Sequence, residues 1–305
     1  MVDISIIIVT FNSAGVIKKC LSCIKNNIDS LNVELIIIDN NSKDETMAAV
    51  KDFFPISQKS PTLKIIENSI NTGYARGVNQ GLKIASGDFI LLINPDVFIT
   101  DGFFNRIIDF FKENSDIGLF APQHLSMGNK IIPSCREFPD HLTLLWEITG
   151  LSILFKRSKI FGKWRMEYFD HKSKREVDQP MGSCLIGRKK VINEVGFMDE
   201  RFTMFFNDVD WCRRFKENGY KVVFNPEIKV HHLVGHSVMQ RKYSMILYSH
   251  FAFYLYLQKY YKKWWHKIFN VLSGIILFTT AFIRIVILFF SPKRKKQLKL
   301  KQNFN

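Results

Sequence analysis

Two apolar patterns alternate along the first half of the chain, continuous apolar runs and apolar residues at helical spacing. Short, nearly continuous apolar runs cover residues 4–9, 33–38, 63–66 and 89–93. Such runs are typical of strands that are buried on both faces of a parallel sheet. Apolar residues at helical spacing predict helices over residues 14–27 and over residues 102–114. The capping-box spacing of Ser42 and Glu45 predicts that another helix begins there. The order strand, helix, strand, helix at the start of the chain favours an α/β fold with a mostly parallel, doubly wound sheet and helices on both faces.

Acidic residues follow two of these predicted strands, at the point where each strand ends. Asp39 follows the second strand, and the motif Asn94-Pro95-Asp96 follows the fourth, which must end there because proline cannot donate to a ladder. In open α/β sheets ligands bind at the carboxyl edge. Asp96 is therefore suited to hold a divalent cation and, through it, a diphosphate, and Asp39 to accept hydrogen bonds from a nucleotide. A simple turn is the alternative interpretation of both sites.

Three glycines stand at four-residue spacing at the head of a further helix, Gly73, Gly77 and Gly81. Each costs a helix about 1 kcal/mol relative to alanine, so a close approach of the backbone to a ligand or to another helix would explain them. The spacing differs from the dinucleotide and Walker motifs, so neither a dinucleotide fold nor an ATPase is supported. Arg76 lies among them as a candidate phosphate ligand or as an ordinary solvated side chain.

The second half of the chain is less regular. Residues 120–180 are interpreted as a sheet-edge segment and variable loops that form an acceptor site, and residues 222–224 as a last short strand. Asp208 and Asp210 lie beside four aromatic residues, a setting that raises carboxyl pKa values and suits a general base. They would alternatively stabilise the start of a helix. Of the three histidines that follow the last strand, at most one is expected to bind metal.

The motifs occur in an order that resembles one enzyme family. The blocks lie at residues 6–13, 36–42, 71–81, 94–96, 196–202 and 207–210. Together they are similar to the family 2 glycosyltransferases of the GT-A fold, in the branch with the rhamnosyltransferase-like enzymes of bacterial surface polysaccharide synthesis. The resemblance covers roughly residues 3–240.

The resemblance implies roles for individual residues. The donor nucleotide-sugar would be bound by Thr10, Phe11, Asn12, Asp39, Asn41, Gly73, Arg76, Gly77, Asn79, Asn94, Pro95 and Asp96. Asp96 and His232 would ligate Mg²⁺ or Mn²⁺, and Asp208 would be the catalytic base. On the acceptor side, or in support of the base, would stand Asn207, Asp210 and Trp211. The chain departs from the family at Asn94, where the first acid of the DxD motif is missing, and at Asn207, where a glutamate is common.

The implied activity is an inverting transfer of a sugar from a nucleoside-diphosphate donor to a hydroxyl of a lipid-linked glycan, in the synthesis of an O-antigen or capsule type of polysaccharide. The alternative is a non-catalytic, membrane-bound protein that binds nucleotide-sugars. The two missing acids give it some support, and the presence of Asp96, Asp208 and His232 together argues against it. A sugar-phosphate nucleotidyltransferase would need a glycine-rich, basic signature after the first strand, and this chain has Thr10-Phe11-Asn12 there.

Charge divides the chain into a near-neutral body and a basic tail. The net charge is +15, and residues 231–305 contain 13 Lys and Arg and no acid, so the first 230 residues carry 15 − 13 = +2. We expect a glycosyltransferase domain over residues 1–240 and a membrane-associating tail over residues 241–305. The alternative for the tail, a soluble helix with a nucleic-acid-binding end, has no nucleic-acid module to support it.

The tail has three features of a membrane-associated segment, and residues 250–305 are expected to contact the bilayer. Residues 250–267 carry an aromatic belt with lysines, and residues 268–290 are long enough to span a bilayer or to lie in its plane. Lys293 to Lys296 form a basic cluster suited to anionic lipids. The odd number of cysteines, five, and the lack of a secretory signal predict a reducing compartment. Together they predict the cytoplasmic face of the inner (plasma) membrane.

Overall fold

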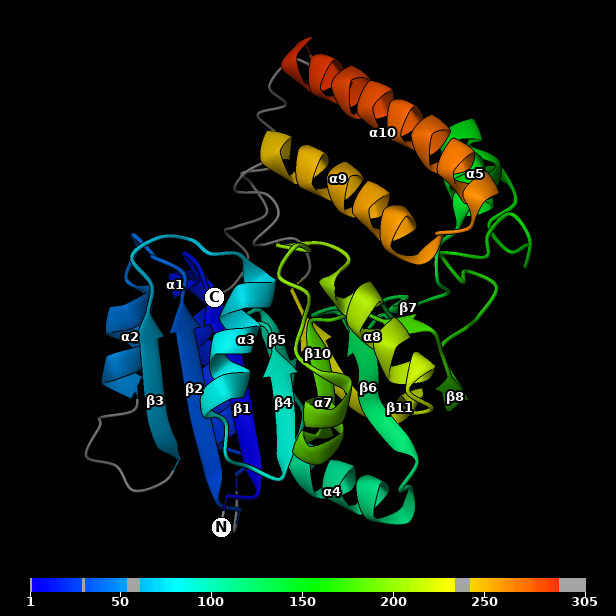
Figure 1. The fold of residues 1–305 in the computed structure, drawn as a ribbon. Helices are drawn as coiled ribbons and strands as arrows, with labels where there is room; N and C mark the ends of the chain where they lie inside the picture. The colour runs from blue at the N-terminus through cyan, green and yellow to red at the C-terminus, as the bar shows by residue number, and fades with distance from the viewer. Residues whose placement is uncertain (1, 29–30, 54–60, 234–241, 291–305) are drawn as a thin grey trace. The chain divides into compact units, whose positions relative to one another are not determined.

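A computed structural model describes residues 2–28, 31–53, 61–233 and 242–290 of the chain. The chain divides into two compact units, Met1–Gln240 and Arg241–Asn305. The first unit contains the sheet and its covering helices, and the second contains two long helices (Figure 1).

The first unit is built on one large sheet with the strand order β3-β2-β1-β4-β10-β6-β11-β5, and β8 pairs with β11. The strands are β1 Ile4–Thr10, β2 Val33–Asp39, β3 Thr62–Glu67, β4 Phe89–Ile93, β5 Val97–Ile99, β6 Ile117–Leu125, β8 Arg175–Glu176, β10 Cys184–Arg188 and β11 Lys221–His232. Strands β5, β8 and β10 run against the others, so the sheet is mostly parallel, as the sequence predicts.

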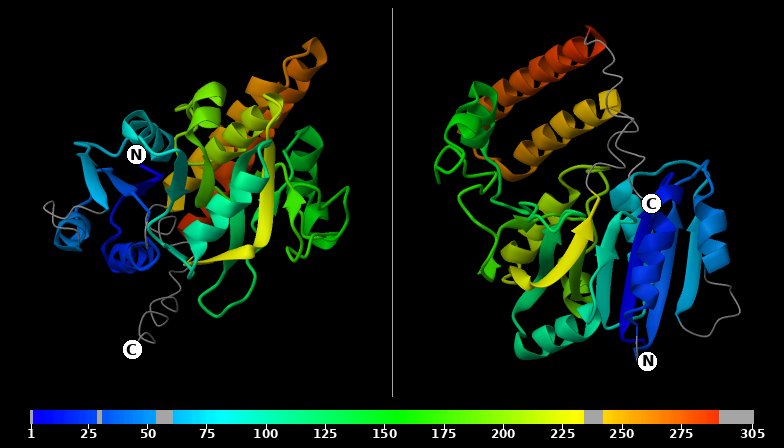
Figure 2. Two further views of the ribbon diagram at one scale, coloured as in Figure 1. Left: turned by 90° about the horizontal axis from the view of Figure 1, so that it is seen from below. Right: turned by 180° about the vertical axis from the view of Figure 1, so that it is seen from behind.

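Helices cover both faces of this sheet. One face carries α1 Ala14–Lys25, α2 Thr46–Phe53 and α4 Phe103–Glu113, and the other carries α3 Tyr74–Ile84, α7 Lys189–Val195 and α8 Asn207–Glu217. In Figure 1 the helices α3, α7 and α8 lie in front of the sheet, and the view from behind shows α1 in front (Figure 2). Because successive side chains of a strand point to opposite faces, both faces of β1 must be apolar. This explains its continuous apolar run.

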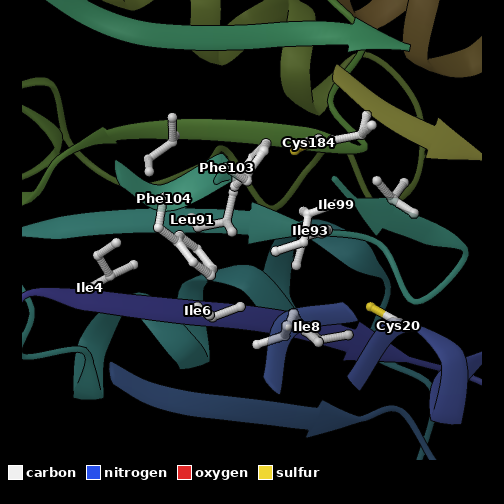
Figure 3. Close-up of a cluster of buried hydrophobic side chains, with 14 of the residues drawn as sticks. Ile4, Ile6, Ile8, Cys20, Leu91, Ile93, Ile99, Phe103, Phe104 and Cys184 are labelled. Atoms are coloured by element: carbon white, nitrogen blue, oxygen red, sulfur yellow. The ribbon is translucent and has the colours of Figure 1, made fainter. Parts of the chain in front are cut away.

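The core between the sheet and α1, α2 and α4 joins distant parts of the chain. Ile4, Ile6 and Ile8 of β1 point into it together with Leu91 and Ile93 of β4 (Figure 3). Phe103 and Phe104 of α4 pack in the same cluster, and both are fully buried. This burial fixes β4, and with it the turn that carries Asp96, against β1.

The region from residue 120 to residue 180 differs from the expectation. Strand β6 is not a sheet-edge segment, because it lies between β10 and β11 and all its residues are buried. Pro122 is tolerated there because β10 pairs with β6 only at Leu119 and Phe120, and β11 has a register shift beyond Asn225, the partner of Pro122. Strand β11 is also much longer than the predicted residues 222–224, and it extends to His232.

A small second sheet and two helices complete this region. Strands β7 Cys135–Arg136 and β9 Gln179–Pro180 pair antiparallel, apart from the main sheet. Between them the chain forms α5 His141–Thr149 and α6 Leu151–Leu154. The side chain of Asp140 caps α5 by accepting from the backbone nitrogen of Thr143 at 2.7 Å. The loops of this region are therefore partly ordered by their own helices.

The second unit contains α9 Lys242–Tyr260 and α10 Trp264–Phe290. Within the described ranges, α10 is the one helix that is long and apolar enough to cross a membrane, with a mean hydropathy of 2.4. Arg284 is the charged residue within its predicted span, residues 268–290. The basic cluster at Lys293 to Lys296 lies outside the described residues.

The glycines of α3 pack against the sheet rather than against another helix. A Cβ atom added to Gly77 would lie 2.9 Å from Cγ1 of Val9, and one added to Gly81 would lie 2.6 Å from Cγ2 of Ile7. Both partners are in β1. Gly73 instead precedes the helix with a φ of +87°, a conformation that side chains rarely adopt. Gly77 and Gly81 thus allow α3 to approach β1 closely.

We expect Gly81→Ala to lower the free energy of unfolding by about 1 kcal/mol, because overpacking against the β-branched Ile7 costs about 1–3 kcal/mol and exceeds the helix propensity gained. The melting temperature should fall by about 2–4 °C. Gly128→Ala is the control, since its Cβ would meet nothing closer than Ser126 Oγ at 3.9 Å. An unchanged or raised melting temperature for Gly81→Ala would contradict the packing argument.

Candidate active site at the carboxyl edge of the sheet

The loops that follow β1 and β2 are bonded into one shelf. The backbone nitrogen of Asn12 donates to Ser42 Oγ at 2.9 Å, and Asn12 Oδ1 accepts from the nitrogen of Lys43 at 2.8 Å. Asn12 and Asn41 both adopt left-handed conformations, with φ of 49° and 65°. Asparagine tolerates this region better than most residues. The structure therefore brings the predicted donor residues of the first two loops together.

Asp39 holds these two loops together through hydrogen bonds. Its Oδ1 accepts from Thr10 Oγ1 at 2.9 Å and from Ser42 Oγ at 2.5 Å, and its Oδ2 accepts from the nitrogen of Ser42 at 2.9 Å. A carboxylate has about four acceptor positions. Three are used within the protein, so the turn interpretation of Asp39 is realised, and one acceptor position remains.

The start of α3 is fixed by protein contacts. The nitrogen of Tyr74 donates to the carbonyl oxygen of Thr203 at 2.7 Å, and the buried Asn40 side chain donates to the carbonyl oxygen of Gly73 at 3.0 Å. Asn79 is bonded in both directions to Met198, at 2.9 Å. These contacts join α3 to the segment before α8.

The predicted donor residues of α3 differ in exposure. Gly77 and Asn79 are buried in packing contacts, whereas the Arg76 side chain is 60% exposed and lies 3.9 Å from Glu200. Of these three, Arg76 has the side chain that is accessible to a donor.

Asp96 and His232 form the centre of the site. The turn that follows β4 contains Asn94, Pro95 and Asp96, and Asp96 is buried and directly precedes β5. Asp96 Oδ1 lies 3.6 Å from His232 Nε2, and it is a buried oxygen without a hydrogen-bond partner within the described ranges. Two ligand atoms at this separation fit around one ion at about 2.1 Å from each. Of the other two histidines, His231 contacts Asn129, and His236 lies outside the described residues.

His124 of β6 adds a residue that the sequence does not single out. Its Nδ1 lies 3.2 Å from His232 Nδ1. Burial lowers the pKa of His124 to about 3, so its ring is neutral near pH 7. One of the two facing nitrogens must carry the proton. If His232 donates through Nδ1, its Nε2 presents a lone pair toward Asp96, which is the form that binds a metal. No group of three metal-binding side chains is assembled in the part of the chain that the structure describes.

Asp208 lies in the first turn of α8. Its Oδ2 accepts from Gln179 Nε2 at 2.8 Å and from the nitrogen of Gly182 at 3.0 Å, and its Oδ1 accepts from the nitrogen of Val209 at 2.9 Å. Burial raises the pKa of this carboxyl above its ordinary value, and the hydrogen bonds oppose that shift. Both interpretations of Asp208, a first-turn acid and a carboxyl with a raised pKa, are therefore realised together.

The segment Gly182–Ser183 connects Asp208 to the Asp96 pair. Gly182 donates to Asp208, while the hydroxyl of Ser183 lies 3.5 Å from His232 Nδ1 and its carbonyl accepts from Asn94 at 2.9 Å. The hydroxyl of Tyr74 donates to the carbonyl oxygen of Gly182 at 3.4 Å, and burial, followed by the charge of Asp208, raises the pKa of this phenol. The structure thus brings the predicted base and the predicted metal pair to one place.

The remaining predicted residues have structural contacts. Asn207 donates to the carbonyl oxygen of Met204 at 3.0 Å, and Trp211 Nε1 donates to the carbonyl oxygen of Gly196 at 2.9 Å. Asp210 is fully buried and pairs with Arg214 at 3.1 Å. They hold α8 to the segment that precedes it, which is a supporting role for Asp208.

Sequence reasoning missed four residues of this site, which are Tyr74, His124, Arg136 and Gln179. Each stands outside the motif positions that suggest chemistry, and Arg136 and Gln179 lie in the region from 120 to 180 that has no clear periodicity. One signal was available for His124. Gln123 and His124 are polar residues in the otherwise apolar strand β6.

Comparisons with known proteins identify the family of the chain. The model of the family described as glycosyl transferase family 2 matches residues 5–245. The chain is 26% identical over 244 residues to an N-acetylglucosaminyl-diphospho-decaprenol L-rhamnosyltransferase of Mycobacterium tuberculosis, and the alignment covers 76% of this chain and 77% of that protein.

Solved structures show the same fold. The structure of TarS residues 1–349 from S. aureus in complex with UDP matches with a TM-score of 0.54 at 18% identity, over 82% of this chain and 65% of that one. A mannosyltransferase from Pyrobaculum calidifontis in complex with GDP-Man and Mn²⁺ matches with a TM-score of 0.57 at 13% identity, over 95% of this chain and 75% of that one. The GT-A fold expected from the sequence is therefore confirmed.

The raised pKa of Asp208 predicts a pH-dependent cost to stability. Because the folded-state pKa lies above the unfolded value, the carboxylate destabilises the fold above that pKa, and the cost vanishes below about pH 4, where the group is protonated in both states. The melting temperature of Asp208→Asn, measured relative to the wild type, should therefore rise as the pH increases from 4 to 8. Asp109→Asn is the control, because Asp109 is 68% exposed on α4. A difference that is flat or falls with pH would contradict the argument.

Proposed function

The chain belongs to glycosyl transferase family 2, and from this premise we propose that it is an inverting glycosyltransferase that moves a sugar from a nucleoside-diphosphate donor to a hydroxyl of a lipid-linked glycan. The observation that carries the proposal is the pair of acidic sites joined by Gly182–Ser183, with the half-buried Asp208 on one side and the buried Asp96 with His232 on the other. The products would be surface polysaccharides of the O-antigen or capsule type.

Donor binding is assigned to the carboxyl edge of the sheet. The shelf made by Asn12, Asp39 and Asn41 would hold the nucleotide, and Arg76 is accessible to its phosphates. Asp96 and His232 would bind Mg²⁺ or Mn²⁺, for which the unpartnered Oδ1 of Asp96 and the facing Nε2 of His232 are suited. When bound, such an ion neutralises the charge that develops on the leaving diphosphate.

The transfer itself would be a single displacement at the anomeric carbon. Asp208 accepts the proton of the acceptor hydroxyl while that oxygen forms its bond to the anomeric carbon, and the bond from this carbon to the diphosphate oxygen breaks on the opposite face. A carboxyl whose pKa is raised by burial is a better proton acceptor than an exposed one. Gln179 and Gly182 keep the Asp208 oxygens in place through their hydrogen bonds. One such displacement inverts the anomeric configuration.

A lipid-linked acceptor is supported by two observations. The mycobacterial relative is named for an acceptor that carries a diphospho-decaprenol group. The helix α10 of this chain has the length and apolarity of a membrane segment. We propose that the tail anchors the enzyme at the cytoplasmic face of the plasma membrane, where nucleotide-sugars and lipid-linked acceptors meet.

A non-catalytic nucleotide-sugar-binding protein is the competing function. Its support is the missing first acid at Asn94 and the asparagine at position 207. Asn207, however, donates to the carbonyl of Met204, which an ionised glutamate does not do. This position is therefore adapted to hold the turn before α8, and the change leaves Asp208 in place.

The test combines donor binding with transfer in detergent-solubilised protein. We expect one of UDP-, dTDP- or GDP-sugars to raise the melting temperature in an Mn²⁺-dependent way, since a ligand at 100 times its dissociation constant stabilises the fold by about 2.7 kcal/mol. Asp208→Asn should keep this shift and lose transfer to a membrane lipid extract by about 100-fold or more. Asp96→Asn should lose the Mn²⁺-dependent part of the shift.

The same measurement examines His124. His124→Phe should weaken the Mn²⁺-dependent shift, because removal of a partner that orients a metal ligand typically costs 10- to 100-fold in affinity. Asp109→Asn is again the control and should match the wild type. Unchanged transfer by Asp208→Asn would refute our assignment of the base. Donor binding without transfer in the wild type would favour the non-catalytic protein.

Membrane attachment is tested by alkaline carbonate extraction of cell membranes. We expect the full chain to remain in the pellet, because a long apolar helix is not released when surface charges are neutralised. Ile275, Phe278 and Phe282 are exposed on α10, and their joint replacement by glutamine should release the protein into the supernatant. Release of the wild-type chain would argue against a membrane-inserted helix.

A further inference from the structure

One cation near the proposed base makes no ion pair with the residues that the structure describes, although the charges of Asp208, Glu147 and Glu167 act on it. The guanidinium of Arg136 lies over the ring of Trp164, 5.1 Å from its centre. It makes no hydrogen bond or ion pair with the residues that the structure describes, although it has five donors. Arg165 nearby is paired on both oxygens of Glu147. Arg136 is partly buried, and burial lowers the pKa of its guanidinium. Burying a charge without a hydrogen-bonded partner is costly, so the unused donors of Arg136 favour an anionic ligand.

The position of Arg136 is defined by the small sheet of β7 and β9. Arg136 is the direct partner of Gln179 in this antiparallel pair, and side chains of such partners lie on the same face. Gln179 donates to Asp208 at 2.8 Å, and Asp208 is among the charges that act on Arg136. Arg136 therefore lies beside the proposed base.

Gln179 contributes a second group that needs a partner. Its Oε1 is buried and accepts no hydrogen bond from the part of the chain that is described. A guanidinium and a free carbonyl oxygen side by side fit a ligand that combines an anion with a hydroxyl donor. A sugar phosphate has this combination.

We propose that Arg136 binds the phosphate of an acceptor whose sugar is joined to a lipid through a phosphate or diphosphate. The proposal rests on the proposed function and specifies its acceptor. In an inverting displacement the base and the leaving diphosphate lie on opposite sides of the anomeric carbon. Asp96 and His232 serve the donor side, so an anion beside Asp208 comes from the acceptor. Trp164 holds the guanidinium plane, and Gln179 Oε1 accepts from a sugar hydroxyl.

The experiment uses geranyl diphosphate as a soluble probe and geraniol as its uncharged counterpart. Binding to the full chain is measured by tryptophan fluorescence with UDP and Mn²⁺ at saturation, so that the donor's diphosphate site is already filled. We expect the wild type to prefer the diphosphate over the alcohol. Arg136→Gln should weaken diphosphate binding at least about tenfold and leave geraniol binding unchanged, because charge-assisted hydrogen bonds are lost. Arg136→Lys should recover part of the loss.

Arg175→Gln is the matched control. Arg175 also lies over an aromatic ring, 5.2 Å from the centre of Phe169, but it is exposed on β8. It should bind the probe like the wild type. Equal diphosphate binding by Arg136→Gln and wild type, or no preference of the wild type for the diphosphate, would overturn the proposal. If Arg136→Gln binds the diphosphate like the wild type, Arg136 serves only to stabilise ionised Asp208. In that case the acid limb of the pH profile of transfer lies at higher pH in Arg136→Gln than in the wild type. If UDP and Mn²⁺ do not raise the melting temperature of the wild type, the proposed donor site is refuted instead.

Discussion

Strand β10 is the constraint on which the site depends. It is inserted between β4 and β6 and runs against both, with Cys184 opposite Ile93 and Gly187 opposite both Ile90 and Leu119. Its first residue therefore lies at the carboxyl end of β4. The residues before it, Gly182 and Ser183, are delivered to the edge where Asp96 stands. A parallel strand in this position would have delivered its last residues instead.

The insertion of β10 also positions β6 and β11 relative to the first half of the sheet. Because β6 pairs with β10 on one side and with β11 on the other, His124 and His232 emerge side by side. Gly187 is needed between the strands, since a Cβ there would lie 2.7 Å from the carbonyl oxygen of Gly118. Close strand packing and the position of the polar cluster thus have one origin.

The site concentrates groups that the fold alone does not satisfy. Asp96 Oδ1, His124 Nε2 and Gln179 Oε1 are buried without a hydrogen-bond partner within the described ranges, and Asp208 is held with a raised pKa. Each such group costs stability in a protein interior. Their convergence on one edge of the sheet is what separates this region from the apolar cores around β1, where no comparable cost is incurred. Unsatisfied groups and raised carboxyl pKa values of this kind are typical of functional sites.

The sequence by itself determined the first half of the fold, and it supplied the predicted site residues that the structure brings to one edge of the sheet. Continuous apolar runs define β1, β2 and β4, because strands buried on both faces leave no other pattern, and Pro95 marks the end of β4. It did not determine that β6 is central, that β11 reaches His232, or that Gly77 and Gly81 pack on β1, because pairing partners and interatomic gaps carry no local signal. Only the tertiary structure decided which polar residues meet. His124, Arg136 and Gln179 stand at least 136 − 124 = 12 positions apart in the sequence, and the pairing of β10, β6 and the small sheet brings them to Asp96 and Asp208.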